Sequence, residues 1–149
     1  MVRMFMLGLG VLFLSSAACA EDLKSYLLRF DYAERKAMKI GSAELTELMT
    51  QGRVQLVDIR FHEEHEAWNL PHSVHIPLNE LPNRLNELDP KKLVVTACPH
   101  KDRAVMARLY LTTKGFKAKY LEDGLVGLAE HLRGDRAKDF INNRLKEGP

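Results

Sequence analysis

One short stretch of the chain carries the residue types needed for thiol chemistry. Cys98 is followed by the polar run Pro99-His100-Lys101-Asp102-Arg103 and is preceded by the apolar run Leu93–Ala97. Such an apolar run is typical of a strand buried on both faces, and residues 104–114 have the apolar spacing of a helix. Cys98 is therefore predicted at the carboxyl end of a strand, just before a helix, where open α/β sheets bind their ligands.

This position would favour a negatively charged sulfur. The start of a helix offers backbone N–H groups that lack intrahelical partners, together with the positive end of the helix dipole. We expect the main-chain amides of residues 99–103 to form an anion nest, and Lys101 and Arg103 to add positive charge. A thiolate in this setting would have a depressed pKa and would be nucleophilic. The same cradle would hold a persulfide or an incoming oxyanion. The alternative, a buried and unreactive cysteine, is disfavoured by the polar residues that follow Cys98.

Four other polar residues near these segments have more modest expected roles. Asp58 and Arg60 follow an apolar strand and are interpreted as a structural pair that supports the loops, rather than as catalysts. His100 could act as a base or hydrogen-bond donor, but a solvent-facing side chain is favoured. Asp102 could pair with a neighbouring cation and hold the shape of the loop.

A histidine cluster raises the question of a metal site. His62, His65, His72 and His75 fall within fourteen residues. Clustered imidazoles can bind zinc or copper, but no cysteine lies among them and their spacing is not that of a regular ligand set. We interpret them as solvated or hydrogen-bonded side chains, so the sequence predicts neither a metal nor another cofactor.

The N-terminus resembles a secretory signal. Arg3 precedes an apolar run over residues 4–14, and Ala18-Cys19-Ala20 ends the segment with small residues. Cleavage after Ala20 would release a bacterial periplasmic protein with no stable membrane insertion. An uncleaved anchor is less favoured because the apolar run is too short to span a bilayer. Lipidation at Cys19 is also less favoured, because Ser16 stands where the lipoprotein box usually has Leu, Val or Ile.

Composition restricts the class of protein further. The chain has 149 residues, enough for one domain, with 46% hydrophobic and 28% charged residues, as in globular proteins. Its 22 basic and 20 acidic residues give no broad basic field for binding nucleic acid. Once residues 1–20 are removed, Cys98 is the remaining cysteine and has no internal disulfide partner.

Four segments are expected along the chain: a signal peptide at 1–20, an amphipathic helix at 21–39, an α/β domain at 40–134 and a C-terminal helical tail at 135–149. Within the domain, strands are predicted at 54–59, 74–77, 93–97 and 118–121. Helices are predicted over 78–88, 104–114 and 125–132, and a further helix is expected to begin with Ser42 as its N-cap. Alternating strands and helices favour a central, mostly parallel sheet with helices on both faces. Residues 21–39 could pack on the domain, dimerise or face a membrane.

The order of these motifs resembles the rhodanese family. The matching segments are Val57-Asp58-Ile59-Arg60, Glu63-Glu64, Pro71, Ile76-Pro77-Leu78, Leu93–Cys98, Arg103-Ala104, Lys114-Gly115-Phe116, Tyr120-Leu121-Glu122 and Gly124. The resemblance covers roughly residues 40–132 and implies a sulfurtransferase. In such an enzyme a small sulfur-containing anion, for example thiosulfate, gives its sulfur to Cys98 as a persulfide. A thiol or a cyanide-like acceptor, protein thiols included, then removes it.

Loop length and loop composition qualify this interpretation. Tyrosine phosphatases use a loop with five residues between Cys and Arg, whereas four lie between Cys98 and Arg103, and the smaller cradle suits a single sulfur atom. Lys101 stands where the family commonly has Gly, a residue suited to positive φ. This substitution motivates a second hypothesis, a sulfur carrier or redox-sensing module with negligible turnover.

Overall fold

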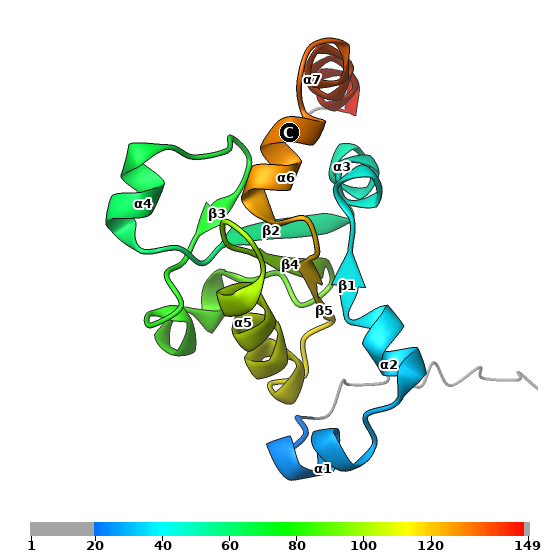
Figure 1. Cartoon of the computed structure of the whole chain (residues 1–149), viewed down its shortest axis with the longest axis vertical. Coiled ribbons are helices and arrows are strands. Elements are labelled where there is room, and N and C mark those ends of the chain that lie inside the picture. Colours follow the sequence, from blue (N-terminus) through cyan, green and yellow to red (C-terminus); the bar gives the residue numbers. More distant parts are fainter. Residues whose placement is uncertain (1–19, 148–149) are drawn as a thin grey trace, which may run out of the picture.

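The computed structural model describes residues 20–147; the expected signal segment, including Cys19, lies outside this range apart from Ala20. Five parallel strands form one sheet in the order β1-β5-β4-β2-β3 (Figure 1). The strands are β1 (Lys39–Ile40), β2 (Val54–Asp58), β3 (Val74–His75), β4 (Leu93–Ala97) and β5 (Ala118–Leu121). The predicted α/β class with a parallel sheet is confirmed, and β1, too short for any periodic pattern, is an additional edge strand.

Helices cover both faces of the sheet. The helices of the domain are α3 (Ser42–Thr50), α4 (His62–Ala67), α5 (Asp102–Thr113), α6 (Gly124–His131) and α7 (Asp135–Glu147). Side chains of α3, α6 and α7 join one buried cluster with Leu56 and Val95. Side chains of α5 join a second cluster with Val57 and Val94, on the opposite face. Neighbouring strand residues thus face different cores, which explains the nearly unbroken apolar runs of β2 and β4.

The register of the two central strands sets the position of the loops. Asp58 of β2 lies opposite Ala97 of β4, and both are the last residues of their strands. The chain therefore leaves the sheet at the same edge after each of these strands. This places the segment after Asp58, with α4, beside the segment after Ala97, with α5 (Figure 1).

The segment before the domain differs from the single helix expected at 21–39. It forms two short helices, α1 (Leu23–Leu28) and α2 (Tyr32–Ala37). The Asp31 side chain accepts a hydrogen bond from the Glu34 backbone N–H and so starts a new helix where the periodic pattern alone suggests continuation.

The α1–α2 segment is fixed to the domain by a buried polar network. Arg108 of α5 is 4% exposed and donates hydrogen bonds to the Tyr26 hydroxyl and to Glu34. Its Nε donates to the carbonyl oxygen of Ala118 at 3.1 Å, and the Tyr26 hydroxyl donates to Glu34 Oε1 at 3.0 Å. Of the three roles considered for residues 21–39, packing on the domain is therefore the one present in this structure.

Removing the Tyr26 hydroxyl is expected to destabilise the fold. In Tyr26→Phe, Arg108 and Glu34 lose a buried partner, and we expect a loss of about 1–3 kcal/mol in the free energy of unfolding. Urea titration followed by circular dichroism would measure it. Tyr32→Phe is the matched control, because Tyr32 is 88% exposed. Equal stability of the two variants would contradict a stabilising role for the network.

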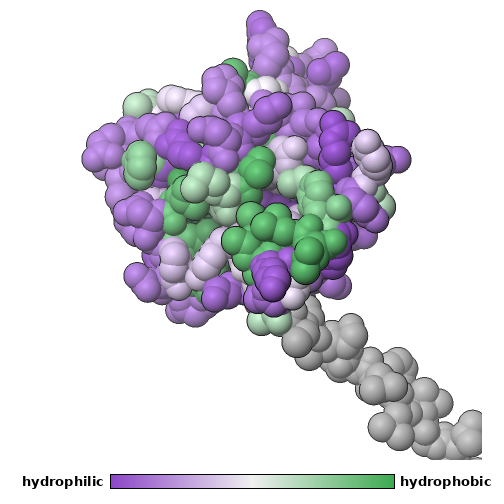
Figure 2. All heavy atoms as spheres, turned by 60° about the horizontal axis from the view of Figure 1, so that its bottom comes forward, coloured by the Kyte–Doolittle hydropathy of each residue, from purple (hydrophilic) through white to green (hydrophobic). Residues whose placement is uncertain are grey.

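Apolar side chains gather on the outer surface of this segment. Leu23, Leu27 and Leu28 of α1 are 49%, 57% and 79% exposed. Figure 2, which brings the α1 end of the molecule forward, has a contiguous apolar area on this face. No helix within residues 20–147 has both the length and the apolar character required to cross a bilayer.

Two local predictions are wrong. The helix expected at 78–88 is replaced by two 3₁₀ turns, η1 (Leu81–Asn83) and η2 (Leu85–Glu87). The leucine spacing is real, but Pro82 provides no N–H and disfavours a helical residue before it. Ser42 is the first residue of α3 rather than its N-cap, which is Gly41. The Ser42 backbone N–H donates to Asp123 Oδ2 at 2.8 Å, so an acidic side chain from the start of α6 supports this helix.

Candidate active site around Cys98

The fold places Cys98 where the sequence predicts, directly after β4 and four residues before the start of α5. Its side chain, however, is 0% exposed and joins the buried cluster that contains Ile59 and Ala104. The prediction that the polar residues after Cys98 disfavour a buried cysteine is therefore wrong. The first turn of α5 folds back over the strand end, held by a 2.8 Å hydrogen bond from the Thr96 hydroxyl to the Ala104 carbonyl oxygen.

Helix α6 fixes the backbone of the Cys98 loop. The N–H groups of Leu125 and Val126 donate to the carbonyl oxygens of Cys98 and Pro99 at 2.8 and 3.2 Å. Gly124 makes this approach possible: its φ is +66°, and a Cβ there would lie 2.3 Å from the Pro99 and His100 carbonyl oxygens. Because C=O and N–H point in opposite directions across a trans peptide, the His100 N–H points away from α6.

The electrostatics around the sulfur differ from the expectation of a depressed pKa. Burial raises the pKa of the Cys98 thiol, and a hydrogen bond to Asp102 and the charge of that carboxylate raise it further. Hydrogen bonding from the backbone N–H groups of Ala104 and Arg103 acts in the opposite direction. The backbone amides at the start of α5 therefore favour the thiolate, but burial outweighs them and the resting group is a thiol.

The two cations expected to attract an anion are placed differently. Arg103 makes a bidentate ion pair with Glu64 of α4, with N–O distances of 2.6 and 2.8 Å, and the hydrogen bond to Glu64 raises the pKa of Arg103. Lys101 and His100 are exposed. The φ of Lys101 is −152°, so this loop does not require the glycine that is common in the related pattern.

Asp58 and Arg60 form the buried pair expected from their spacing. Both side chains are 0% exposed, and Arg60 Nη2 lies 2.6 Å from Asp58 Oδ2. Arg60 also donates to the carbonyl oxygens of Glu64 and Trp68 and stacks 4.1 Å from the ring of Trp68, which is 39% exposed. Arg60 therefore holds α4 through its middle, at Glu64, and through its C-cap, Trp68.

Three of the four clustered histidines come together beside this pair. His65 and His75 stack with ring centroids 3.9 Å apart, and His62 meets His75 edge-on at 5.0 Å. Their ring nitrogens contact Asp58, Glu80 and the Arg60 carbonyl oxygen. His72 lies apart, against Phe140. Among the described residues, no group of three or more His, Cys, Asp and Glu side chains is arranged to hold a metal ion.

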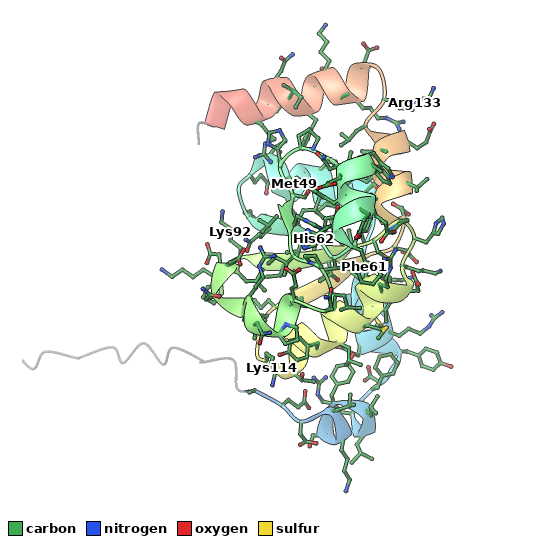
Figure 3. All side chains as sticks on the ribbon, turned by 90° about the vertical axis from the view of Figure 1, so that its left-hand side faces the viewer. Met49, Phe61, His62, Lys92, Lys114 and Arg133 are labelled. Atoms are coloured by element: carbon green, nitrogen blue, oxygen red, sulfur yellow. The ribbon has the colours of Figure 1, made fainter. Side chains whose placement is uncertain are left out.

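Sequence reasoning missed the roles of the two carboxylates that contact this site. Glu64 was identified only as part of a motif, without a role, and Asp102 was expected to pair with a cation rather than with the thiol. Phe61 and His62 begin the α4 segment on the face that Figure 3 turns toward the viewer, and the Arg103 guanidinium lies 5.5 Å from the Phe61 ring. Only the three-dimensional register of α4 and α5 reveals these contacts, because Glu64 and Arg103 are 39 positions apart.

Comparison with known proteins places this arrangement in a family context. A family model described as "Rhodanese-like domain" matches residues 42–131. The chain is 33% identical over 86 residues to the thiosulfate sulfurtransferase GlpE of Pseudomonas syringae, covering 58% of this chain and 80% of that protein. It is 36% identical over 89 residues to the HTH-type transcriptional regulator Rv0324 of Mycobacterium tuberculosis, covering 58% of this chain but 39% of the regulator. The solved human single-domain sulfurtransferase TSTD1 superposes with a TM-score of 0.54 at 25% identity, covering 63% of this chain and 96% of that one.

Proposed function

The chain belongs to the rhodanese-like domain family, and from this membership we propose that it is a sulfurtransferase in which Cys98 accepts sulfane sulfur as a persulfide. The carrying observation is the position of Cys98 between the carboxyl end of β4 and the start of α5, where the backbone N–H groups of Arg103 and Ala104 favour a negative charge on its sulfur. The similarity to the Pseudomonas thiosulfate sulfurtransferase supports sulfur transfer, and thiosulfate is the donor named for that relative.

The transfer takes two displacements at sulfur. The Cys98 thiolate attacks the outer sulfur of thiosulfate, a new S–S bond forms, and sulfite leaves with the electron pair of the broken S–S bond. An acceptor such as cyanide or a thiolate then attacks the outer sulfur of the persulfide and releases the Cys98 thiolate. Because the pKa of the thiol is raised, the reactive thiolate fraction increases as pH rises toward and through that pKa.

The proposed setting is the bacterial periplasm. Arg3, the apolar run at residues 4–14 and the Ala18-Cys19-Ala20 ending support export through a cleaved signal peptide. The acceptor there would be a small thiol or a protein thiol. Amino-terminal sequencing of the protein from a periplasmic extract tests this proposal: a start at Glu21 supports it, and an unprocessed start at Met1 contradicts it.

Intact-protein mass spectrometry tests the sulfur-transfer proposal. Incubation of the full chain with a sulfane-sulfur donor is expected to add the mass of one sulfur atom, and cyanide is expected to remove it with release of thiocyanate. Thiosulfate and a small-molecule hydropersulfide should both be supplied in separate reactions. Failure of both donors to add sulfur would overturn the proposed function.

A second candidate is a low-turnover sulfur carrier or redox-sensing module of the same fold. The observation that favours it is the complete burial of Cys98, which would slow exchange with acceptors. Persulfide that forms within seconds but stays on the protein in the presence of excess cyanide and small thiols would support this candidate. Repeated turnover under the same conditions would exclude this candidate and favour the sulfurtransferase.

A further inference from the structure

The charged group nearest to the Cys98 sulfur is negative. Asp102 Oδ1 lies 3.5 Å from Sγ and accepts a hydrogen bond from the thiol. Asp102 is the first residue of α5, where its carboxylate is favoured by the backbone N–H groups of that turn, and the hydrogen bond from the Arg103 N–H holds the pKa of Asp102 below its ordinary value. This carboxylate is therefore ionised at neutral pH and faces the atom that would receive sulfur.

The cationic groups around the loop do not compensate for this charge. The guanidinium of Arg103 is matched by both carboxylate oxygens of Glu64, at 2.6 and 2.8 Å. Lys101, His100 and Asp102 are all exposed, so water and salt screen all three charges, but among these three it is Asp102 that hydrogen-bonds to the sulfur, at 3.5 Å. Asp58 and Arg60 neutralise each other within the core. The charge in direct contact with Sγ is therefore negative, and it opposes the approach of an anionic donor.

We propose that Asp102, with Glu64 neutralising Arg103, makes this site select a weakly charged hydropersulfide donor over a doubly charged donor such as thiosulfate. This inference rests on the proposed function and names its substrate class. The favoured reaction transfers a sulfur atom between thiols: Cys98–SH and R–S–SH give Cys98–S–SH and R–SH. The donor S–S bond breaks, the new S–S bond forms at Sγ, and one proton passes to the leaving thiolate.

The hydrogen bond to Asp102 fits the product of this reaction as well as the resting state. A neutral thiol donates to the carboxylate at 3.5 Å, and the terminal S–H of a neutral persulfide has the same donor capacity. A thiosulfate dianion, in contrast, must approach a carboxylate with two charges of the same sign.

Alkylation of Cys98 tests the charge selection without requiring any sulfur transfer. Iodoacetamide is neutral and iodoacetate is an anion, yet both form the same type of thioether and release iodide. We expect the iodoacetamide-to-iodoacetate rate ratio at Cys98 of the full chain, separated from Cys19 by peptide mass mapping, to exceed that of a free cysteine peptide. In Asp102→Asn this ratio should fall roughly tenfold, the effect of one unit charge a few Å from the reacting atom. Glu63→Gln, an exposed acid on α4, is the control and should keep the wild-type ratio.

The rate of persulfide formation from each donor provides a second test. Removing the carboxylate also lowers the pKa of the thiol, which accelerates both donors alike, so the ratio of their rates is the informative quantity. Asp102→Asn should raise the rate of persulfide formation from thiosulfate, relative to that from cysteine hydropersulfide, by about tenfold. Glu64→Gln, which frees the guanidinium of Arg103, should shift both assays in the same direction and serves if Asp102→Asn does not fold. Unchanged ratios in a folded variant, or slower loading from thiosulfate, would overturn the inference about donor charge. Sulfur loading of the wild-type protein would still support the proposed function in that case.

Discussion

Cys98→Ser is expected to abolish sulfur transfer and leave the fold intact. A serine hydroxyl is not ionised at neutral pH and cannot hold a sulfane sulfur, so neither displacement can occur. The rate of thiocyanate formation from donor and cyanide should fall to that of the reaction without protein. The measurement is a steady-state assay with the full chain, together with intact mass after incubation with donor.

Serine suits this experiment because of the environment of the thiol. Cys98 is 0% exposed, and its hydrogen-bond acceptor, Asp102 Oδ1, remains available to a hydroxyl. We therefore expect a stability change of about 1 kcal/mol or less. Turnover by a folded Cys98→Ser protein would show that the sulfur is carried elsewhere and would exclude the proposed mechanism.

Removing Arg60 is expected to produce the largest loss of stability in the domain. In Arg60→Ala the Asp58 carboxylate keeps its burial but loses its cation, and the carbonyl oxygens of Glu64 and Trp68 lose a donor. Breaking a buried pair by removing one partner costs about 3–5 kcal/mol, a large share of the stability of a domain of this size. Urea titration would show the midpoint displaced strongly toward low denaturant, or no folded baseline.

A matched exposed pair and a compensated variant make this result specific. Arg84 pairs with Glu80 and Glu87 on the surface, so Arg84→Ala should cost about 1 kcal/mol or less. The double variant Asp58→Asn/Arg60→Leu removes both charges and should recover part of the loss. A similar cost for Arg60→Ala and Arg84→Ala would contradict the role assigned to the buried pair.

The same pair predicts how stability responds to acid. Although burial disfavours the charged form, hydrogen bonds from Arg60 and His65 hold the pKa of Asp58 below its ordinary value. The unfolded chain therefore takes up the Asp58 proton at higher pH than the folded protein does. The contribution of this group is complete above the ordinary Asp pKa and is lost as pH falls through the lower, folded value.

The fold could be predicted from the sequence where burial dictates residue type. The apolar runs of β2 and β4 identified the two central strands to within a residue, because strands buried on both faces favour apolar side chains. Prediction failed where a local effect opposes periodicity. Pro82 breaks the helix that the leucine spacing suggests, and the side chain of Asp31 divides residues 21–39 into two helices.

The site could be predicted in position but not in charge. The strand-to-helix transition places Cys98, and its neighbours in sequence, Lys101 and Arg103, suggest a cationic loop. Two contacts in the structure contradict this expectation. Glu64, 39 positions away in sequence, pairs with Arg103, and Asp102 accepts a hydrogen bond from the thiol. Sequence proximity indicates which charges are near a site, whereas their pairing depends on the tertiary register.

The close contact between α6 and the Cys98 loop has a mechanical consequence. With no room for a Cβ at position 124 and two loop carbonyl oxygens held by α6 N–H groups, the loop cannot shift without carrying that helix along. A displacement of the Cys98 loop would therefore also displace the start of α6, where Val126 is exposed at the surface.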